Sequence, residues 1–323
     1  MPLGFRAVTD AESAGRRPGW RQWGMTAVKI VFLVAVLVGG VAYIVEHRVA
    51  IWAAVSSMNP GWLVVAFVAV LGALVLSMLS WTVLWPAFGV RLRVVRGARL
   101  YFISQLGKYL PGSVWTIAAQ AQMAGELGVS RSSSIVLSLI ALLVSVALGL
   151  GIGVTLLPFI DPHLLGEYWW VVIVGVALLA CLVPTVLRLG VRLALKVLRR
   201  PSSAFTYDWV VAARTSGAQA ANWLLGGLQL WLILIGLGVD PVRSLLPSIA
   251  AFALASSLGI LLIPFPAGLG VREFVITLVL TSVTDAETAV AAALLSRLLY
   301  VFADFGLAAL GAATGRRARA ISR

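Results

Sequence analysis

Two stretches of this chain place a cation beside a proline and glycine break in an otherwise apolar segment. Residues 106–115 read Leu-Gly-Lys-Tyr-Leu-Pro-Gly-Ser-Val-Trp and carry Lys108, and residues 263–273 read Ile-Pro-Phe-Pro-Ala-Gly-Leu-Gly-Val-Arg-Glu and carry Arg272. A helix that restarts after such a break has free backbone N–H groups in its first turn and offers about half a positive charge to an anion. We expect the two breaks to face one another and to bind an anionic group such as a phosphate.

New helices are expected to start at Ser113 and Val271, directly after the break glycines. Tyr109 and Trp115 are expected to cover the site or to pack against neighbouring helices, and buried glutamines line it or bond to a neighbouring helix. The predicted substrate-binding residues are Lys108, Arg272, Gly107, Pro111, Gly112, Ser113, Gly268, Gly270 and Glu273, and the predicted supporting residues are Arg297, Asp304, Gln105, Tyr109, Trp115 and Gln120.

The acids near these cations offer an alternative role for them. Glu273 follows Arg272 directly, and Arg297 and Asp304 lie seven residues apart on one helix face. These four charges can neutralise one another as structural pairs. Seven helical residues span about 10 Å, so Arg297 and Asp304 are each expected to reach another segment. Lys108 has no acid close by in its own segment and is therefore the cation expected to contact substrate.

The sequence shows no arrangement typical of catalysis or metal binding. Gly107-Lys108 lacks the upstream glycine of a nucleotide-binding loop, and no paired-carboxylate or Ser/His/Asp pattern is visible. The single Cys181 lies in an apolar run, and His47 and His163 fall in predicted loops. We expect no enzyme activity, no cofactor and no metal.

The composition is that of a membrane protein. Of the 323 residues, 61% are hydrophobic and 11% charged, whereas soluble domains have about 45–50% and about 25%. A net charge of +13 would suggest a nucleic-acid partner in a soluble protein. Here the cations lie in short loops between apolar runs, where they set topology and contact anionic lipid heads. We therefore expect an all-α polytopic membrane protein without a nucleic-acid partner.

Six apolar runs are long enough to cross a bilayer, which takes about 20 residues. They lie between basic tails at 1–26 and 315–323, and residues 27–314 form one transmembrane domain. An amphipathic stretch at 187–198 is expected to lie along the lipid head groups. The expected spans are 27–45, 62–85, 132–157, 168–187, 219–238 and 286–311, and the two broken segments cover about 98–128 and 245–283.

The charges test this topology, because cytoplasmic loops carry the Lys and Arg residues. With both termini inside, Arg48 and Arg243 fall in outer loops and Arg272 and Arg297 in the membrane, which leaves 21 of the 25 basic residues on the cytoplasmic side. This division requires each broken segment to enter and leave on one side, the first from inside and the second from outside. The loop at 188–214 is then cytoplasmic, and the loops at 161–167 and 285–287 are external.

The same order of features occurs twice. Residues 62–157 and 219–311 each read as a span, a Gly-Val loop, a broken segment and a second span. The copies start on opposite sides, so they form an inverted repeat, as in many transporters that bind substrate between their repeats. The alternative is a chance similarity of hydropathy. In the third span, Gly149, Gly151 and Gly153 allow close approach either by another helix or by a lipid tail.

Three stretches resemble the transmembrane domain of the bacterial lysylphosphatidylglycerol synthase/flippase family and its stand-alone flippase-like relatives. They are Ser104-Gln-Leu-Gly-Lys-Tyr-Leu-Pro-Gly-Ser-Val-Trp115, Gly128-Val-Ser-Arg131 and Pro264-Phe-Pro-Ala-Gly-Leu-Gly-Val-Arg-Glu273. The resemblance covers about residues 25–315, and Ala267 departs from the more usual Pro-Gly-Gly-Leu-Gly but keeps the turn. It implies lipid translocation or lipid-linked glycan traffic. No soluble aminoacyl-transfer domain follows, so the resemblance implies that this chain does not synthesise an aminoacylated lipid.

The expected function is translocation, across a bacterial inner membrane, of an anionic phospholipid or a polyprenyl-phosphate-linked lipid. One alternative is a non-transporting accessory subunit that binds a glycosyltransferase or a lipid-modifying enzyme. Another is a membrane-embedded transferase acting on a lipid-linked sugar, which the missing acid and base residues disfavour. Because Asp304 is expected to be in a buried pair and Lys108 to contact substrate, Asp304→Asn is expected to lower folded yield more than Lys108→Gln.

Overall fold

The structure is a computed structural model that describes residues 58–110, 114–125, 129–160, 169–197, 207–261 and 270–321, together with 45, 48, 49, 52, 56 and 268. The predicted tail at 1–26 and nearly all of the first predicted span lie outside the described residues, as do Pro111, Gly112 and Ser113. The described part of the chain is all-helical, as the composition predicts.

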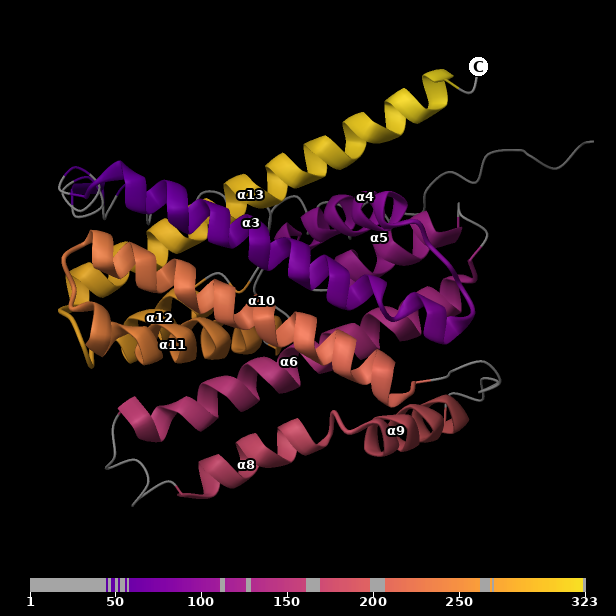
Figure 1. Cartoon of the computed structure of the whole chain (residues 1–323), viewed down its shortest axis with the longest axis horizontal. Helices are drawn as coiled ribbons and strands as arrows, with labels where there is room; N and C mark the ends of the chain where they lie inside the picture. Colours follow the sequence, from indigo (N-terminus) through magenta and orange to yellow (C-terminus); the bar gives the residue numbers. More distant parts are fainter. Residues whose placement is uncertain are drawn as a thin grey trace, which may run out of the picture.

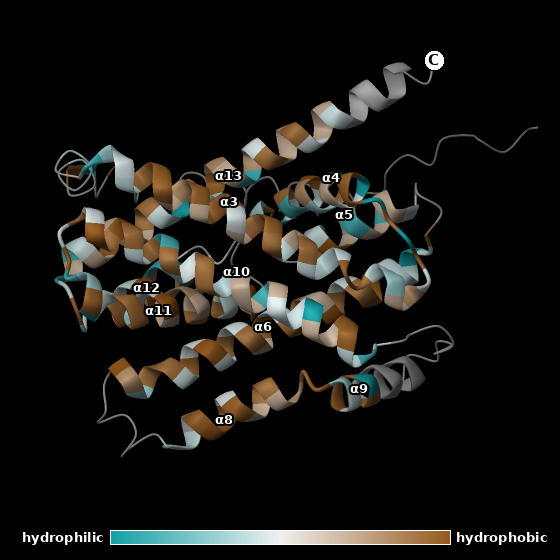
Figure 2. Cartoon of the chain, in the orientation of Figure 1, coloured by the Kyte–Doolittle hydropathy of each residue, from teal (hydrophilic) through white to brown (hydrophobic). Residues whose placement is uncertain are grey.

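Five helices in the described part are long and apolar enough to cross a membrane. Val64 and Val68 on the first of them are exposed, and Figure 2 shows apolar residues along most of the length of the long helices. Such surfaces suit lipid rather than water, so the protein is a polytopic α-helical membrane protein. Four of the five match predicted spans: α3 (Pro60–Thr82), α6 (Arg131–Ile160), α10 (Trp209–Gly236) and α13 (Ala286–Ile321).

The fifth, α11 (Pro241–Leu261), begins the second predicted broken segment, and α12 (Val271–Leu280) packs back against it. In the first broken segment, α4 (Val94–Gln105) leads through the 3-10 turn η2 (Leu106–Tyr109) to α5 (Val114–Gly125). We call residues 94–125 the first hairpin and residues 241–280 the second hairpin. Figure 1 shows the first hairpin in the right half of the molecule and the second in the left half.

The two copies of the predicted repeat run in opposite directions. Helix α3 runs from left to right in Figure 1 and continues through the short η1 (Trp85–Phe88) into the first hairpin. Helix α10 runs from right to left against α3 and leads to the second hairpin. The closing helices α6 and α13 are likewise opposed. This is the inverted arrangement that the sequence predicts.

Glycines with positive φ shape the second break. Gly268 and Gly270 adopt φ values of 66° and 83°, a region in which a Cβ costs about 1–2 kcal/mol. A Cβ on Gly268 would also lie 2.9 Å from the Cα atom of Gly259 in α11. The break is therefore held against the preceding helix, and α12 begins at Val271 as predicted.

The first break uses glycine differently. A Cβ on Gly107 would lie 2.7 Å from the backbone nitrogen of Thr116, closer than side-chain atoms approach backbone. The turn η2 therefore packs directly on the first turn of the following helix. That helix is described from Val114 onward, one residue after the predicted start at Ser113.

The fourth predicted span is interrupted: its two parts are together apolar and long enough to cross a membrane, but they do not form one straight helix. Instead of one helix over 168–187, α8 (Trp169–Ala180) and α9 (Pro184–Val197) meet at a bend of 79°. Pro184 explains the break, because proline has no N–H to continue a helix and disfavours helical geometry in the residue before it. Helix α9 covers most of the amphipathic stretch predicted at 187–198.

The glycines of α6 pack against other helices. A Cβ on Gly149 would lie 2.0 Å from the Ser257 hydroxyl, and one on Gly153 would lie 2.4 Å from the Leu254 side chain, both in α11. The space beside Gly151 is filled in the same way by the side chain of Leu179 of α8. Of the two alternatives for these glycines, helix packing is the one observed.

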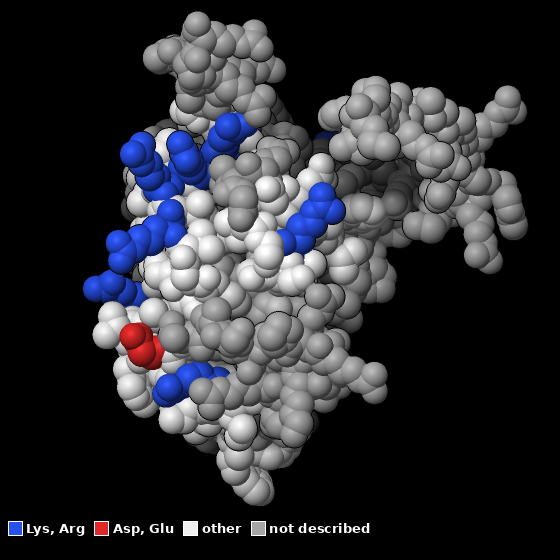
Figure 3. Space-filling model, turned by 90° about the vertical axis from the view of Figure 1, so that its right-hand side faces the viewer, with Lys and Arg blue, Asp and Glu red and all other residues white. Residues whose placement is uncertain are grey.

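Exposed basic residues gather at one end of the molecule. Figure 3 looks at the right-hand end of Figure 1, and the charged side chains that it shows among the described residues are mostly Lys and Arg. This end holds the start of α4, α6 and α10. The asymmetry agrees with the predicted division of charge between the two sides. The exposed arginines on or just before these helix starts are Arg91, Arg93, Arg96, Arg131 and Arg214.

Candidate functional site

A cavity of about 280 Å³ lies where the two hairpins meet α3, α6, α10 and α13. Seven of the predicted site residues, from both hairpins and from α13, line this cavity. They are Lys108, Arg272, Arg297, Asp304, Gln105, Tyr109 and Gln120. Gly107, Gly268, Gly270, Glu273 and Trp115 lie outside its lining and shape or flank it.

The first hairpin is tied to α13 by an ion pair. Lys108 Nζ lies 2.6 Å from Asp304 Oδ2, and the Tyr109 hydroxyl donates to the same oxygen at 2.6 Å. The Asp304 side chain is 1% exposed and the Lys108 side chain 30%. Lys108, which has no acid close by in its own segment, is therefore neutralised across the cavity by Asp304 of the last helix. The other carboxylate oxygen, Asp304 Oδ1, is buried without a hydrogen-bond partner among the described residues.

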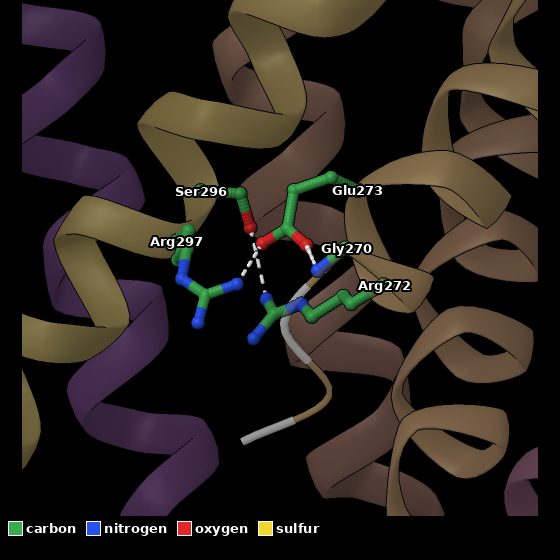
Figure 4. Close-up of polar contacts among 5 residues, drawn as sticks. All are labelled: Gly270, Arg272, Glu273, Ser296 and Arg297. Carbon is green, nitrogen blue, oxygen red and sulfur yellow. Dashed lines mark hydrogen bonds and ion pairs between the residues drawn. The ribbon is translucent and has the colours of Figure 1, made fainter. Parts of the chain in front are cut away.

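The second hairpin is tied to α13 by a pair of opposite polarity. Glu273 Oε1 pairs with Arg297, and Glu273 Oε2 accepts the backbone N–H of Gly270 at 2.8 Å (Figure 4). The expectation that Arg297 and Asp304 each reach another segment is thus confirmed. Both oxygens of Glu273 are occupied, and one of them satisfies the N-terminus of α12. A substrate anion would meet that helix end with an acid already in place.

Arg272 differs from the other charges of the cavity. Its guanidinium donates to Ser296 Oγ at 3.1 Å and lies over the rings of Phe252 and Tyr300, 4.9 and 4.8 Å from their centroids. Among the described residues it has no carboxylate within ion-pair distance, and its Nε has no partner. In Figure 4 the Arg272 and Arg297 guanidinium groups extend into the same space. Arg272 is therefore a partly buried cation whose charge has no direct acid partner in the described chain.

Polar side chains away from the breaks complete the wall. Gln219 and Asn222 of α10 line the cavity together with serines of α3, α6 and α11. Gln219 Nε2 donates to Ser145 Oγ at 2.9 Å, and Trp223 Nε1 donates to Ser145 O at 3.0 Å. The sequence interpretation missed these residues. The available signal was their helical spacing on one face of a predicted span, where polar residues mark a bundle interior.

Rings form the neighbouring part of the wall. Phe252 stacks on Tyr300 with centroids 5.4 Å apart and meets Trp223 edge to face at 6.1 Å. All three rings line the cavity beside Arg272. In the described chain no group of three or more His, Cys, Asp or Glu side chains is placed to hold a metal ion. The arrangement can bind a polar, anionic group of modest size.

The sequence matches the family model described as the lysylphosphatidylglycerol synthase TM region over residues 25–308. No curated protein matches it. The family match covers most of the chain, so the protein belongs to this family of lipid-related membrane proteins.

Proposed function

We propose that this chain, as a member of the lysylphosphatidylglycerol synthase TM-region family, translocates a lipid with an anionic head group across the membrane. The head group occupies the cavity between the two hairpins, and the tails stay in the bilayer. The observation that carries the proposal is Arg272, a partly buried cation on the wall of that cavity, without a carboxylate partner in the described chain and with a buried Nε that has no partner there.

Charge supports an anionic rather than a cationic ligand. Lys108, Arg272 and Arg297 face the site, and the acids paired with them are Asp304 and Glu273. One positive charge therefore remains. Removing a charge from water without giving it a partner is costly, and a phosphate would both neutralise the partly buried Arg272 and bring an acceptor for its unpartnered Nε–H.

The inverted hairpins support movement rather than static binding. Transporters built from inverted repeats hold the substrate where discontinuous helices from the two halves meet, and one half rocks against the other. Here each hairpin is tied to α13 by an ion pair, in addition to hydrogen bonds and packing contacts, so a change at either pair can alter access from one side. The chain itself is proposed to have no catalytic role.

Translocation can be tested in vesicles that contain fluorescent phosphatidylglycerol, with a membrane-impermeant quencher added outside. Arg272→Gln should slow translocation by about tenfold or more, the effect of losing one charged contact to the head group. Arg243→Gln is the matched control, because Arg243 is exposed at the start of α11. A normal rate for a folded Arg272→Gln protein would refute the proposed site. A wild-type chain that moves no anionic lipid would favour the accessory-subunit alternative.

The proposed location is the bacterial inner membrane, with both termini and the loop at 188–214 in the cytoplasm. The exposed arginines at one end support this orientation, because cytoplasmic segments are rich in Lys and Arg. Single cysteines introduced in a Cys181→Ala background and labelled from one side will test it. Labelling near Asp285 from the cytoplasmic side would refute the orientation.

A further inference from the structure

We infer that the head group is a phosphate diester whose second substituent is an uncharged polyol, such as glycerol or a sugar, and that the site discriminates against aminoacylated, cationic head groups. This inference rests on the proposed function, because it names the head group bound in the same cavity.

The acids of the site leave no unshared carboxylate for an ammonium group. Both oxygens of Glu273 are occupied by Arg297 and Gly270, and Glu273 does not line the cavity. Asp304 lines it but is already paired with Lys108. A lysyl head group would bring further cations next to Lys108, Arg272 and Arg297, where each like charge costs binding energy.

One oxygen of the Asp304 carboxylate nevertheless needs a donor. Asp304 Oδ1 is buried and has no hydrogen-bond partner in the described part of the chain. A hydroxyl group satisfies it without adding charge, whereas an ammonium group would have to compete with Lys108 for the same carboxylate. An acceptor of this kind favours a hydroxylated, neutral substituent.

The α10 side of the cavity also matches hydroxyl groups. Asn222 is 7% exposed and lines the cavity, and its side chain makes no hydrogen bond within the described ranges. Ser256 Oγ and Trp81 Nε1 line it too and have no partner there. Together they offer donors and acceptors without charge. A site built to hydrogen-bond a substrate hydroxyl strongly rejects the analogue that lacks it, because its own polar groups are then left unpaired.

Arg272 places the phosphate next to this neutral wall. Its guanidinium packs on Phe252, whose ring meets Trp223, and Trp223 directly follows Asn222 in α10. A phosphate at Arg272 thus has aromatic faces and amide or hydroxyl groups beside it. Ring faces suit the C–H surface of a polyol, and the polar groups suit its hydroxyls.

The test is lipid binding to the full-length protein in nanodiscs, measured by native mass spectrometry with lipids that share the same tails. Phosphatidylglycerol should bind about tenfold more tightly than phosphatidylethanol, which has the same single charge but no hydroxyl, since tenfold corresponds to about one hydrogen bond. Lysylphosphatidylglycerol should bind more weakly than phosphatidylglycerol.

Two near-isosteric variants localise the effect. Asn222→Leu and Ser256→Ala should each weaken the binding of phosphatidylglycerol toward that of phosphatidylethanol, whose own binding should stay unchanged. Ser257→Ala is the matched control, because the Ser257 hydroxyl is also buried without a partner among the described residues but lies against Gly149, outside the cavity lining. It should keep the wild-type preference.

The outcomes separate this inference from the proposed function. Equal binding of phosphatidylglycerol and phosphatidylethanol would refute the inferred polyol substituent. Lysylphosphatidylglycerol that binds as tightly as phosphatidylglycerol would refute the inferred discrimination against cationic head groups. Either result leaves the anion site in place. If no anionic lipid binds better than phosphatidylcholine, the proposed function itself fails.

Discussion

The two hairpins share a plan but distribute their charges in opposite ways. In the first hairpin the break supplies the cation, Lys108, and α13 supplies the acid, Asp304. In the second the acid, Glu273, belongs to the hairpin, and α13 supplies the cation, Arg297. One helix therefore holds both hairpins through charges placed two turns apart on it.

The second hairpin also carries a cation, Arg272, that takes part in neither ion pair with α13. Arg272 sits next to Glu273 in sequence but bonds to Ser296 and to aromatic rings instead. The comparison separates cations that hold the hairpins in place, Lys108 and Arg297, from a cation available to a ligand. It shifts the first candidate for substrate contact from Lys108 to Arg272.

The largest stability effect is expected at the pair of the second hairpin. Glu273→Gln removes the acid beside Arg297, weakens the cap on Gly270 N–H and leaves neighbouring arginines without compensation. The free energy of unfolding should fall by about 3 kcal/mol, since breaking a buried pair costs about 3–5 kcal/mol and the Arg297 side chain is 21% exposed. Thermal unfolding of the purified protein in detergent will measure it.

The matched control is the double variant Glu273→Gln/Arg297→Gln. It removes both charges of the pair and should be more stable than Glu273→Gln alone. If the double variant is the less stable of the two, the cost does not come from the unpaired arginine.

At the pair of the first hairpin, burial reverses the order expected from the sequence. Lys108→Gln leaves the Asp304 carboxylate, 1% exposed, without its cation, whereas Asp304→Asn leaves a lysine that is 30% exposed and can be solvated. We expect Lys108→Gln to cost about 2 kcal/mol and Asp304→Asn less. Comparison of their melting temperatures decides the order, and a greater loss for Asp304→Asn would restore the sequence-based expectation.

The glycines of the two breaks should also differ. Gly268→Ala combines a positive φ with a backbone contact and should cost about 2 kcal/mol. Gly107→Ala meets the backbone of Trp115 and Thr116 without a positive φ and should cost less. Gly217→Ala, with nothing within 4 Å on the exposed face of α10, serves as the control and should be neutral or slightly stabilising. Equal losses of unfolding free energy at Gly107 and Gly268 would show that the positive φ of Gly268 adds no cost beyond the steric contact.

Most of the fold could be predicted from the sequence, because the features that determine it are local in the chain. Apolar length identified α3, α6, α10 and α13, and the proline and glycine pairs located both breaks, including the start of α12 at Val271. The bend before Pro184 was missed because the apolar run continues across it. A hydrophobic count does not register one proline that ends a helix.

The site could be predicted only in part, because its ion pairs join residues that are far apart in the chain. Lys108 and Asp304 are brought together by the packing of the first hairpin on α13. Nothing in the spacing of either residue specifies that contact. The polar face of α10 was also missed, because Asn222 lies in a span identified only by its hydrophobic residues.

The smallest effect is expected where α13 begins, well ahead of Arg297 and Asp304 along the helix. Asp285 accepts the backbone N–H of Thr288 at 2.9 Å and its hydroxyl at 2.8 Å, and these bonds hold the pKa of the exposed Asp285 carboxyl below its ordinary value. Asp285→Ala should cost about 1 kcal/mol, as for other lost N-caps. The charged form is the one that is stabilised, so this contribution is present at neutral pH and is lost from roughly pH 4 downward as the carboxyl gains a proton.

Asp285→Asn is the control: it keeps a capping oxygen and should lose little stability at neutral pH. Melting curves of the three proteins between neutral and acidic pH will measure the difference, which should shrink as the pH falls. Because α13 holds both hairpins, Asp285→Ala should leave the relative sensitivity of the Lys108 and Glu273 variants unchanged. If it weakens one pair selectively, α13 does not act on both hairpins as one rigid support.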